Sequence, residues 1–128
     1  MKRISQSELE VMSVLWLEAA SNQGMAASDV IALLDDKAKG KKWNDRTVKT
    51  LLARLVEKGA VSTTQDGRRY LYAPLIDQDS YAGNAARSLS DRLFGGRAAP
   101  LVAHLAEGKG LSDEDIAELE ALLQDLKS

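Results

Sequence analysis

The sequence predicts a mostly α-helical protein with one small β-hairpin, made of an N-terminal domain over residues 1–76 and a C-terminal helical domain over residues 77–128. Apolar residues recur at helical spacing through most of the chain, but just after residue 60 they alternate with a period of two. Charge separates the same two parts, because residues 1–76 carry a net charge of +3 and residues 77–128 a net charge of −5. We therefore expect two domains with different roles.

The first two helices are predicted from capping residues and apolar spacing. Ser5 and Glu8 have the spacing of a capping box, and the apolar residues that follow predict a helix over about 6–19. Ser28 is a favourable N-cap for a shorter helix over 29–37.

The third helix has two chemically different faces. Asn44 or Asp45 is expected to cap it, and it runs to Lys58, where Gly59 occupies the usual C′ position. Residues spaced i, i+3, i+4 and i+7 form an apolar face that must pack on the other helices: Val48, Leu51, Leu52 and Leu55. The opposite face collects basic and threonine side chains: Arg46, Thr47, Lys49, Thr50 and Arg54.

A hairpin follows the third helix. Residues 60–65 (AVSTTQ) and 68–74 (RRYLYAP) are predicted as short strands, joined by Asp66-Gly67, a pair favoured in tight hairpin turns. Three helices followed by a hairpin, with the third helix basic, describe a winged helix-turn-helix.

Positive charge is concentrated around this third helix. Between Lys37 and Arg69 there are ten basic and three acidic residues, a net charge of +7 within a chain whose total is −2. An α-helix fits the major groove of B-DNA, and such helices read bases mainly from their N-terminal residues. We therefore predict that the polar face of the third helix contacts DNA, while Arg68 and Arg69 in the hairpin reach a neighbouring groove or the backbone.

The C-terminal domain is predicted to dimerise. Its sequence has two heptad-like apolar seams, one of Ala82, Ala86, Leu89 and Leu93, the other of Ile116, Leu119, Leu123 and Leu126. A segment this short cannot easily bury enough surface alone, so pairing with a second copy is the expected solution. Pro100 suits the start of a middle helix, and Ser112 can cap the last one. The alternative is an intramolecular three-helix core built from the same residues.

The sequence gives no support for an enzyme, a metal site or a cofactor. The single histidine, His104, lies among apolar residues as an ordinary helix residue, and the absence of cysteine excludes disulfides and Cys-ligated metal sites. The longest unbroken apolar run, 30–34, is far too short to span a membrane, and the N-terminus lacks the apolar region of a signal peptide. We therefore expect a cytoplasmic protein that is not embedded in a membrane.

Four stretches resemble one known family. They are ELEVMSVLW at 8–16, W-x-x-R-T-V-K-T-L-L-A-R-L-V-E-K-G at 43–59, YLYAP at 70–74 and LFGG at 93–96. Together they resemble the penicillinase-repressor family, which includes the BlaI, MecI and CopY repressors, and the similarity covers nearly the whole chain. The resemblance implies a homodimeric transcriptional repressor, with a winged-helix domain on double-stranded operator DNA and a helical C-terminal dimerisation domain. Carried over by motif, the DNA-reading residues are Arg46, Thr47, Lys49 and Thr50, with Arg54 on the phosphate backbone.

The resemblance also bears on how DNA is released. In the penicillinase repressors, release is linked to proteolytic cutting at an Asn-Phe pair in the C-terminal domain. Here His104-Leu105 occupies that position. Both side chains that a membrane sensor metalloprotease would recognise are therefore different. Two interpretations stay open: His104-Leu105 is a proteolytic switch that severs the last seam from the first, or it is ordinary helix and release depends on another signal.

A function of another class also stays open. The chain could be a winged-helix adaptor without sequence-specific DNA binding, whose acidic C-terminal half contacts a basic protein partner. Salt separates the two, since binding through several DNA phosphates weakens steeply as salt is added and should show a sequence preference.

Overall fold

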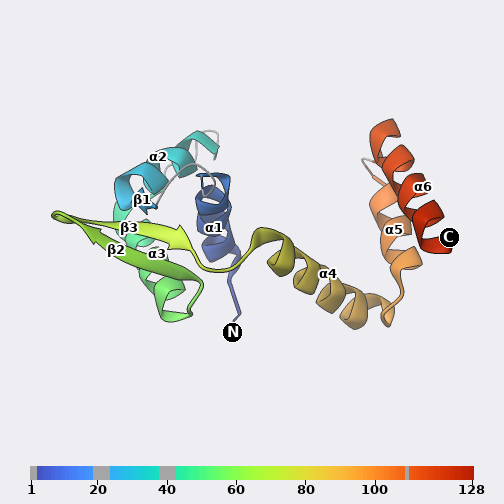
Figure 1. The fold of residues 1–128 in the computed structure, drawn as a ribbon, viewed down its shortest axis with the longest axis horizontal. Helices are drawn as coiled ribbons and strands as arrows, with labels where there is room; N and C mark the ends of the chain where they lie inside the picture. The colour runs from blue at the N-terminus through green and yellow to red at the C-terminus, as the bar shows by residue number, and fades with distance from the viewer. Residues whose placement is uncertain (1–2, 19–23, 38–42, 109) are drawn as a thin grey trace. The chain divides into compact units, whose positions relative to one another are not determined.

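The computed structural model describes residues 3–18, 24–37, 43–108 and 110–128 (Figure 1). The chain divides into two compact units, Met1–Tyr81 and Ala82–Ser128. The division falls inside helix α4 (Gln78–Phe94), so the first turn of this helix belongs to the first unit.

The first unit combines three helices with a three-stranded antiparallel sheet of order β1-β3-β2. This arrangement confirms the predicted mostly helical fold with a hairpin wing; the predicted end of the first helix at Ala19 lies outside the described residues. The elements are α1 (Gln6–Glu18), β1 (Met25–Ala26), α2 (Ala27–Lys37), α3 (Asp45–Glu57), β2 (Val61–Asp66) and β3 (Arg69–Pro74).

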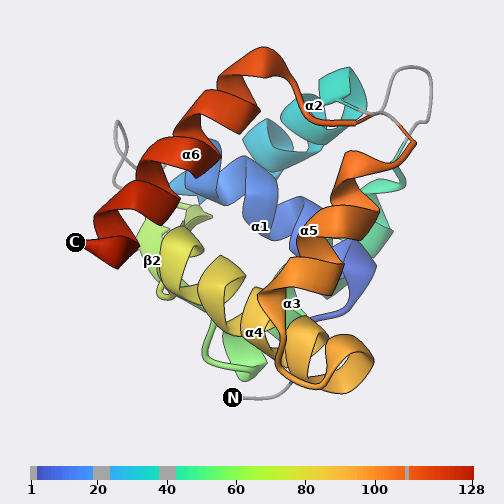
Figure 2. The same cartoon turned by 90° about the vertical axis from the view of Figure 1, so that its right-hand side faces the viewer.

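One hydrophobic core holds the three helices and the sheet together. Figure 2 shows the ribbons of α1, α2 and α3, which lie beside one another in this unit. Each helix contributes one apolar face, and burying a side chain of this size is worth about 1.5 to 3 kcal/mol. The largest apolar side chains with essentially no exposed surface are Met12, Leu15, Leu52, Leu55, Val11, Val14, Val30, Val48 and Val61.

The capping box at the start of α1 is present. The backbone N–H of Glu8 donates to Oγ of Ser5 over 3.2 Å, and the backbone N–H of Ser5 donates to Oε1 of Glu8 over 2.8 Å. These two bonds satisfy donors that the first turn of a helix otherwise leaves unpaired, so α1 begins where the sequence predicts.

Helix α2 begins two residues earlier than predicted. The short strand β1, which sequence reasoning missed, pairs Met25 with Tyr72 and Ala26 with Leu71, and α2 follows it directly. Ser28 therefore lies inside the first turn of α2 and does not precede it as a cap. Gly24 permits this pairing, because it has a φ of 136° and a Cβ there would lie 3.0 Å from the Cβ of Leu71.

The hairpin turn lies one residue later than predicted. Asp66 pairs with Arg69 as the last rung of the β2–β3 ladder, so the two loop residues are Gly67 and Arg68. Gly67 has a φ of 65°, a conformation that favours glycine at the first position of a two-residue hairpin loop. Arg68 therefore stands at the tip of the wing, and Arg69 is the first residue of β3.

The second unit consists of the rest of α4, α5 (Ala98–Ala106) and α6 (Asp113–Lys127). Helix α4 ends in two glycines with positive φ, Gly95 at 60° and Gly96 at 83°, and the N–H of Gly96 donates to the carbonyl of Ser90 over 3.0 Å. This bond closes the end of α4, and the positive φ that both residues adopt there explains why the sequence places two glycines after Leu93-Phe94.

Helices α5 and α6 begin close to where the capping signals place them. Pro100 lies in the first turn of α5, where its missing N–H removes no helical bond. Oγ of Ser112 accepts from the N–H of Asp115 over 3.0 Å and caps α6. The ring of His104 lies 5.4 Å from that of Phe94 between centroids, so α5 contacts the last turn of α4 at this point.

Candidate nucleic-acid interface

The start of α3 is fixed by Asn44. With φ −75° and ψ 129°, Asn44 is outside the helix, and its Oδ1 accepts from the N–H groups of Arg46 at 2.8 Å and Thr47 at 3.4 Å. Of the two predicted caps, Asn44 is therefore the one used, and Asp45 is the first helical residue. These two bonds hold the first turn of α3, which carries Arg46 and Thr47.

The two faces of α3 differ sharply in exposure. The apolar face is at most 5% exposed at each of Val48, Leu51, Leu52 and Leu55. All five residues predicted for the polar face are exposed: Arg46, Thr47, Lys49, Thr50 and Arg54. The polar face therefore presents three cations and two short hydroxyl side chains within about three helical turns.

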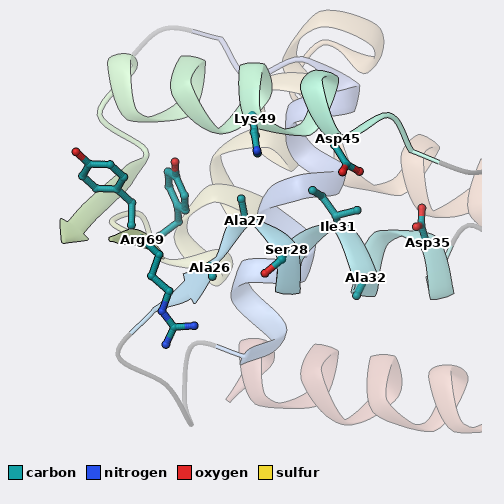
Figure 3. A pocket seen from close by; sticks show the side chains of 11 residues that line it. Ala26, Ala27, Ser28, Ile31, Ala32, Asp35, Asp45, Lys49 and Arg69 are labelled. Carbon is teal, nitrogen blue, oxygen red and sulfur yellow. The ribbon is translucent and has the colours of Figure 1, made fainter. Parts of the chain in front are cut away.

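A hollow of about 600 Å³ lies beside this face, lined by α2, by the start of α3 and by β1 and β3. Figure 3 shows Lys49 extending into it from α3, with Arg69 on one side of Lys49 and Asp45 and Asp35 on the other. Ser28, in the first turn of α2, lies between them. Lys49 and Arg69 can attract a phosphate, whereas the side of the hollow with the two aspartates would repel one.

The two wing arginines differ in their contacts. Arg69 lies 3.3 Å from Asp66, Nη2 to Oδ2, with more than half of each side chain exposed, so this pair contributes little to stability and can open. Arg68 makes no hydrogen bond or ion pair with any residue that the structure describes. Its guanidinium group is therefore available at the tip of the wing.

The far end of α3 is attached to α1 by an ion pair that sequence reasoning missed. Nζ of Lys58 donates to Oε1 of Glu8 at 2.5 Å and to the carbonyl of Arg3 at 2.7 Å. The side chain of Glu8 is 2% exposed and that of Lys58 19% exposed. Lys58 is therefore withdrawn from the cationic surface, although the charge pattern of the sequence counts it there.

The pKa of Glu8 reflects these contacts. Burial raises this pKa, but the hydrogen bonds from Lys58 and Ser5 and the charge of Lys58 together lower it below its ordinary value of 4.5. Its other oxygen, Oε2, is buried without a hydrogen-bond partner in the described structure. Glu8 is thus charged at neutral pH and depends on Lys58, so loss of Lys58 would leave a buried carboxylate without its cation.

The predicted dimer seams lie open on the second unit. No residue described in 82–128 is buried. Leu123 and Leu126 expose 55% and 74% of their surface, and Leu93 exposes 63%. The other seam residues, all intermediate or exposed, are Ala82, Ala86, Leu89, Ile116 and Leu119. Both apolar faces therefore lack a covering surface within the described chain.

The remaining features offer little other chemistry. Within the described ranges, no group of three or more His, Cys, Asp and Glu side chains is arranged to hold a metal ion. Among the same residues, no helix is both long enough and apolar enough to cross a membrane. His104 and Leu105 lie near the end of α5, where both are exposed.

Known proteins resemble this chain over nearly its full length. The family model described as penicillinase repressor matches residues 4–125. The penicillinase repressor of Bacillus licheniformis is 34% identical over 126 residues, which cover 98% of this chain and 93% of that protein. The methicillin resistance regulatory protein MecI of Staphylococcus aureus (strain N315) is 26% identical over 120 residues, 94% of this chain and 92% of that protein.

A solved structure gives a further comparison. It is the solution structure of monomeric BlaI from Bacillus licheniformis in complex with the blaP half-operator. It is 36% identical to this chain, covers 62% of this chain and 89% of that one, and gives a TM-score of 0.48.

Proposed function

The chain belongs to the penicillinase repressor family, and we propose on that premise that it is a transcriptional repressor that binds operator DNA as a homodimer. The relatives quoted above are named as repressors or regulatory proteins and not as enzymes. The proposed site of action is the cytoplasm, where bacterial DNA is found.

The polar face of α3 is the observation that carries the proposal. Among the described residues, Arg46, Lys49 and Arg54 form no ion pair with an acidic side chain, so their charges are available to a polyanion. A helix face with cations and short hydroxyl side chains suits the major groove, where arginine and lysine recognise guanine and threonine contacts several bases. Arg46, Thr47, Lys49 and Thr50 are the proposed base-reading residues, and Arg54 contacts the backbone.

The wing supplies the second proposed contact. Arg68 at its tip and Arg69 at the start of β3 would bind phosphates or enter the neighbouring groove. Contacts of this kind position the protein on the duplex, and each phosphate neutralised adds to the salt dependence of binding.

The second unit supplies the proposed dimer. A helical segment without a buried residue has no core of its own, and covering its leucines with a second copy would create one. Two-fold pairing would place one α3 on each half of a pseudo-palindromic operator. The half-sites should then be separated by about one helical turn, roughly 10 base pairs, or a multiple of it.

A cut in α5 is a proposed route for the release of DNA. A cut after His104 would separate the seam on α6 from the seam on α4. Co-expression with a cognate membrane metalloprotease should then yield a fragment that ends at His104, and replacing His104-Leu105 by Asp-Gly should prevent both the fragment and derepression. Induction without any fragment would discard this switch and leave the repressor assignment intact.

Selection from a pool of random duplexes tests the function itself. The full chain should enrich one pseudo-palindromic sequence, and its affinity for that sequence should fall steeply between 50 and 200 mM salt, by about 10³-fold or more if it neutralises about six phosphates. Enrichment of no sequence, with binding that scarcely depends on salt, would favour the protein-adaptor alternative.

A further inference from the structure

The hydroxyl group of Thr50 is already engaged within α3. Its Oγ1 donates to the backbone carbonyl of Arg46, one helical turn earlier, over 2.9 Å. A threonine hydroxyl has only one hydrogen to donate. While this bond is made, Thr50 offers a neighbouring molecule its methyl group and an acceptor lone pair, but no donor.

Thr47 provides a contrast within the same helix. Its backbone N–H is capped by Asn44, but its hydroxyl makes no hydrogen bond with any described residue. Thr47 therefore keeps a free donor for a base or a phosphate. The two threonines are alike in the sequence, yet the structure gives them different chemistry.

The position of Thr50 makes its methyl group accessible. At 100° per residue, Thr50 lies roughly 150° around the helix axis from the centre of the buried face of α3. Ala53, one turn further on, is exposed beside it. These two small side chains form an apolar spot within a face otherwise composed of Arg46, Lys49 and Arg54.

On the basis of the proposed function, we propose that Thr50 determines specificity by reading a thymine in each half-site through methyl contact. Thymine is the only DNA base that presents a methyl group, on C5, in the major groove. Contact between the thymine methyl and the methyl of Thr50 would remove both methyl groups from water. The hydroxyl of Thr50 would stay bonded to the carbonyl of Arg46. Methyl contact requires no hydrogen-bond donor. It is therefore compatible with a threonine whose only hydroxyl hydrogen is already donated within the helix.

Deoxyuridine tests this idea, because it differs from thymidine only by the C5 methyl. The probe is the duplex enriched by the full chain from random sequences, with each thymine replaced in turn. At one position in each half-site, the replacement should weaken binding of the unaltered protein roughly fourfold, the cost of exposing about one buried methyl group.

Two variants of Thr50 separate the methyl from the hydroxyl. Thr50→Ser, which keeps the hydroxyl and loses the methyl, should bind the thymine and deoxyuridine duplexes equally at that position. Thr50→Val, which keeps a methyl and loses the hydroxyl, should retain both the affinity and the sensitivity to deoxyuridine.

The result that overturns the proposal is equally specific. Either no position is sensitive to deoxyuridine, or the sensitivity persists in Thr50→Ser, or Thr50→Val loses affinity because the hydroxyl was the reading group. Thr47→Val is the matched control; it removes a free donor, so it should weaken binding without changing the deoxyuridine effect. All of these variants are exposed substitutions among residues of similar helix propensity, and circular dichroism checks that they fold. If no duplex is enriched at all, the proposed function fails first, and the two failures are thereby distinguished.

Discussion

The two units of this chain use the same kind of amphipathic helix with opposite results. Among the described residues, the first unit buries fifteen apolar residues, none more than 7% exposed, and Val11, Met12 and Leu52 are completely inaccessible. The second unit buries none, and Leu126 exposes 74% of its surface. In the first unit three helix faces and a sheet converge on one core, whereas the apolar faces of the second have nothing within the described chain to cover them.

This difference indicates how stability and function are divided. A unit with its own core can hold a rigid recognition surface, and the polar face of α3 is fixed by leucines on its other side and by the attachment of Lys58 to α1. For the second unit, which has no buried core, we propose that a second copy supplies most of the stability and that folding is therefore coupled to association. The four predictions below test this division, from the largest expected effect to the smallest.

Charging the open seam should have the largest effect. Replacing Leu119 and Leu123 with Asp should produce a monomer, because carboxylates would otherwise be buried between apolar helices. A monomer cannot bind both half-sites at once, so operator affinity should fall about 1000-fold, within the usual range for the loss of bivalent binding. Sedimentation measures the dimer, and filter binding measures the affinity.

Two results would count against that account. An unaltered dimer would move the interface away from these leucines. Full operator affinity in a variant that is entirely monomeric would refute the proposal that a dimer binds both half-sites.

A cavity in the closed core should have the next largest effect. Leu52→Ala should lower the free energy of unfolding of the first unit by about 3 kcal/mol, because Leu52 is completely buried. Leu17→Ala is the matched control, since Leu17 lies in α1 with 64% of its surface exposed and should cost less than about 0.5 kcal/mol. Urea denaturation compares the two variants, and equal losses would mean that the core does not dominate stability.

The buried ion pair should give a comparable but pH-dependent effect. Lys58→Met should cost about 3 kcal/mol at neutral pH, since it leaves the carboxylate of Glu8 buried without its cation. The folded state holds the pKa of Glu8 below 4.5, so the pair stabilises fully above that pH and its contribution is lost as pH falls through the folded pKa. Wild type and Lys58→Met should therefore converge in stability in strong acid.

The double variant Glu8→Gln/Lys58→Met controls for packing, and should recover part of the stability at neutral pH because no charge remains buried. If Lys58→Met shows the same deficit at every pH, the loss is one of packing and the proposed charge effect is wrong.

Much of the fold follows from local signals in the sequence. The capping box at Ser5 and Glu8, the i, i+3, i+4, i+7 pattern of α3, and the cap at Ser112 each act within a few residues, so a single sequence reveals them. The strand β1 was missed because two residues have no periodicity, and its pairing with Tyr72 depends on a segment 47 positions away. The hairpin turn was misplaced by one residue because Asp-Gly and Gly-Arg both suit a two-residue loop, and only the register distinguishes them.

The candidate site was predictable in outline but not in detail. Helical periodicity alone selects the outward residues of α3, because their positions follow from its apolar face. Two features required coordinates: the engaged hydroxyl of Thr50, which depends on a rotamer, and the pairing of Lys58 with Glu8, which joins residues 50 positions apart. Net charge counts Lys58 and Arg54 alike. Lys58 is paired with Glu8, however, whereas Arg54 forms no ion pair among the described residues and is available to DNA.

The division of roles along the polar face of α3 provides the most direct test of the account. Binding of the unaltered chain, Lys49→Ala, Thr47→Ala and Arg54→Ala to the selected operator and to a scrambled duplex should be measured at one salt concentration. Lys49→Ala and Thr47→Ala should each lose about 1 to 3 kcal/mol on the operator and less on the scrambled duplex, so their discrimination falls. Arg54→Ala should lose similar amounts on both, with a salt slope smaller by about one. Unchanged affinity in all three variants would contradict the claim that this face of α3 reads DNA.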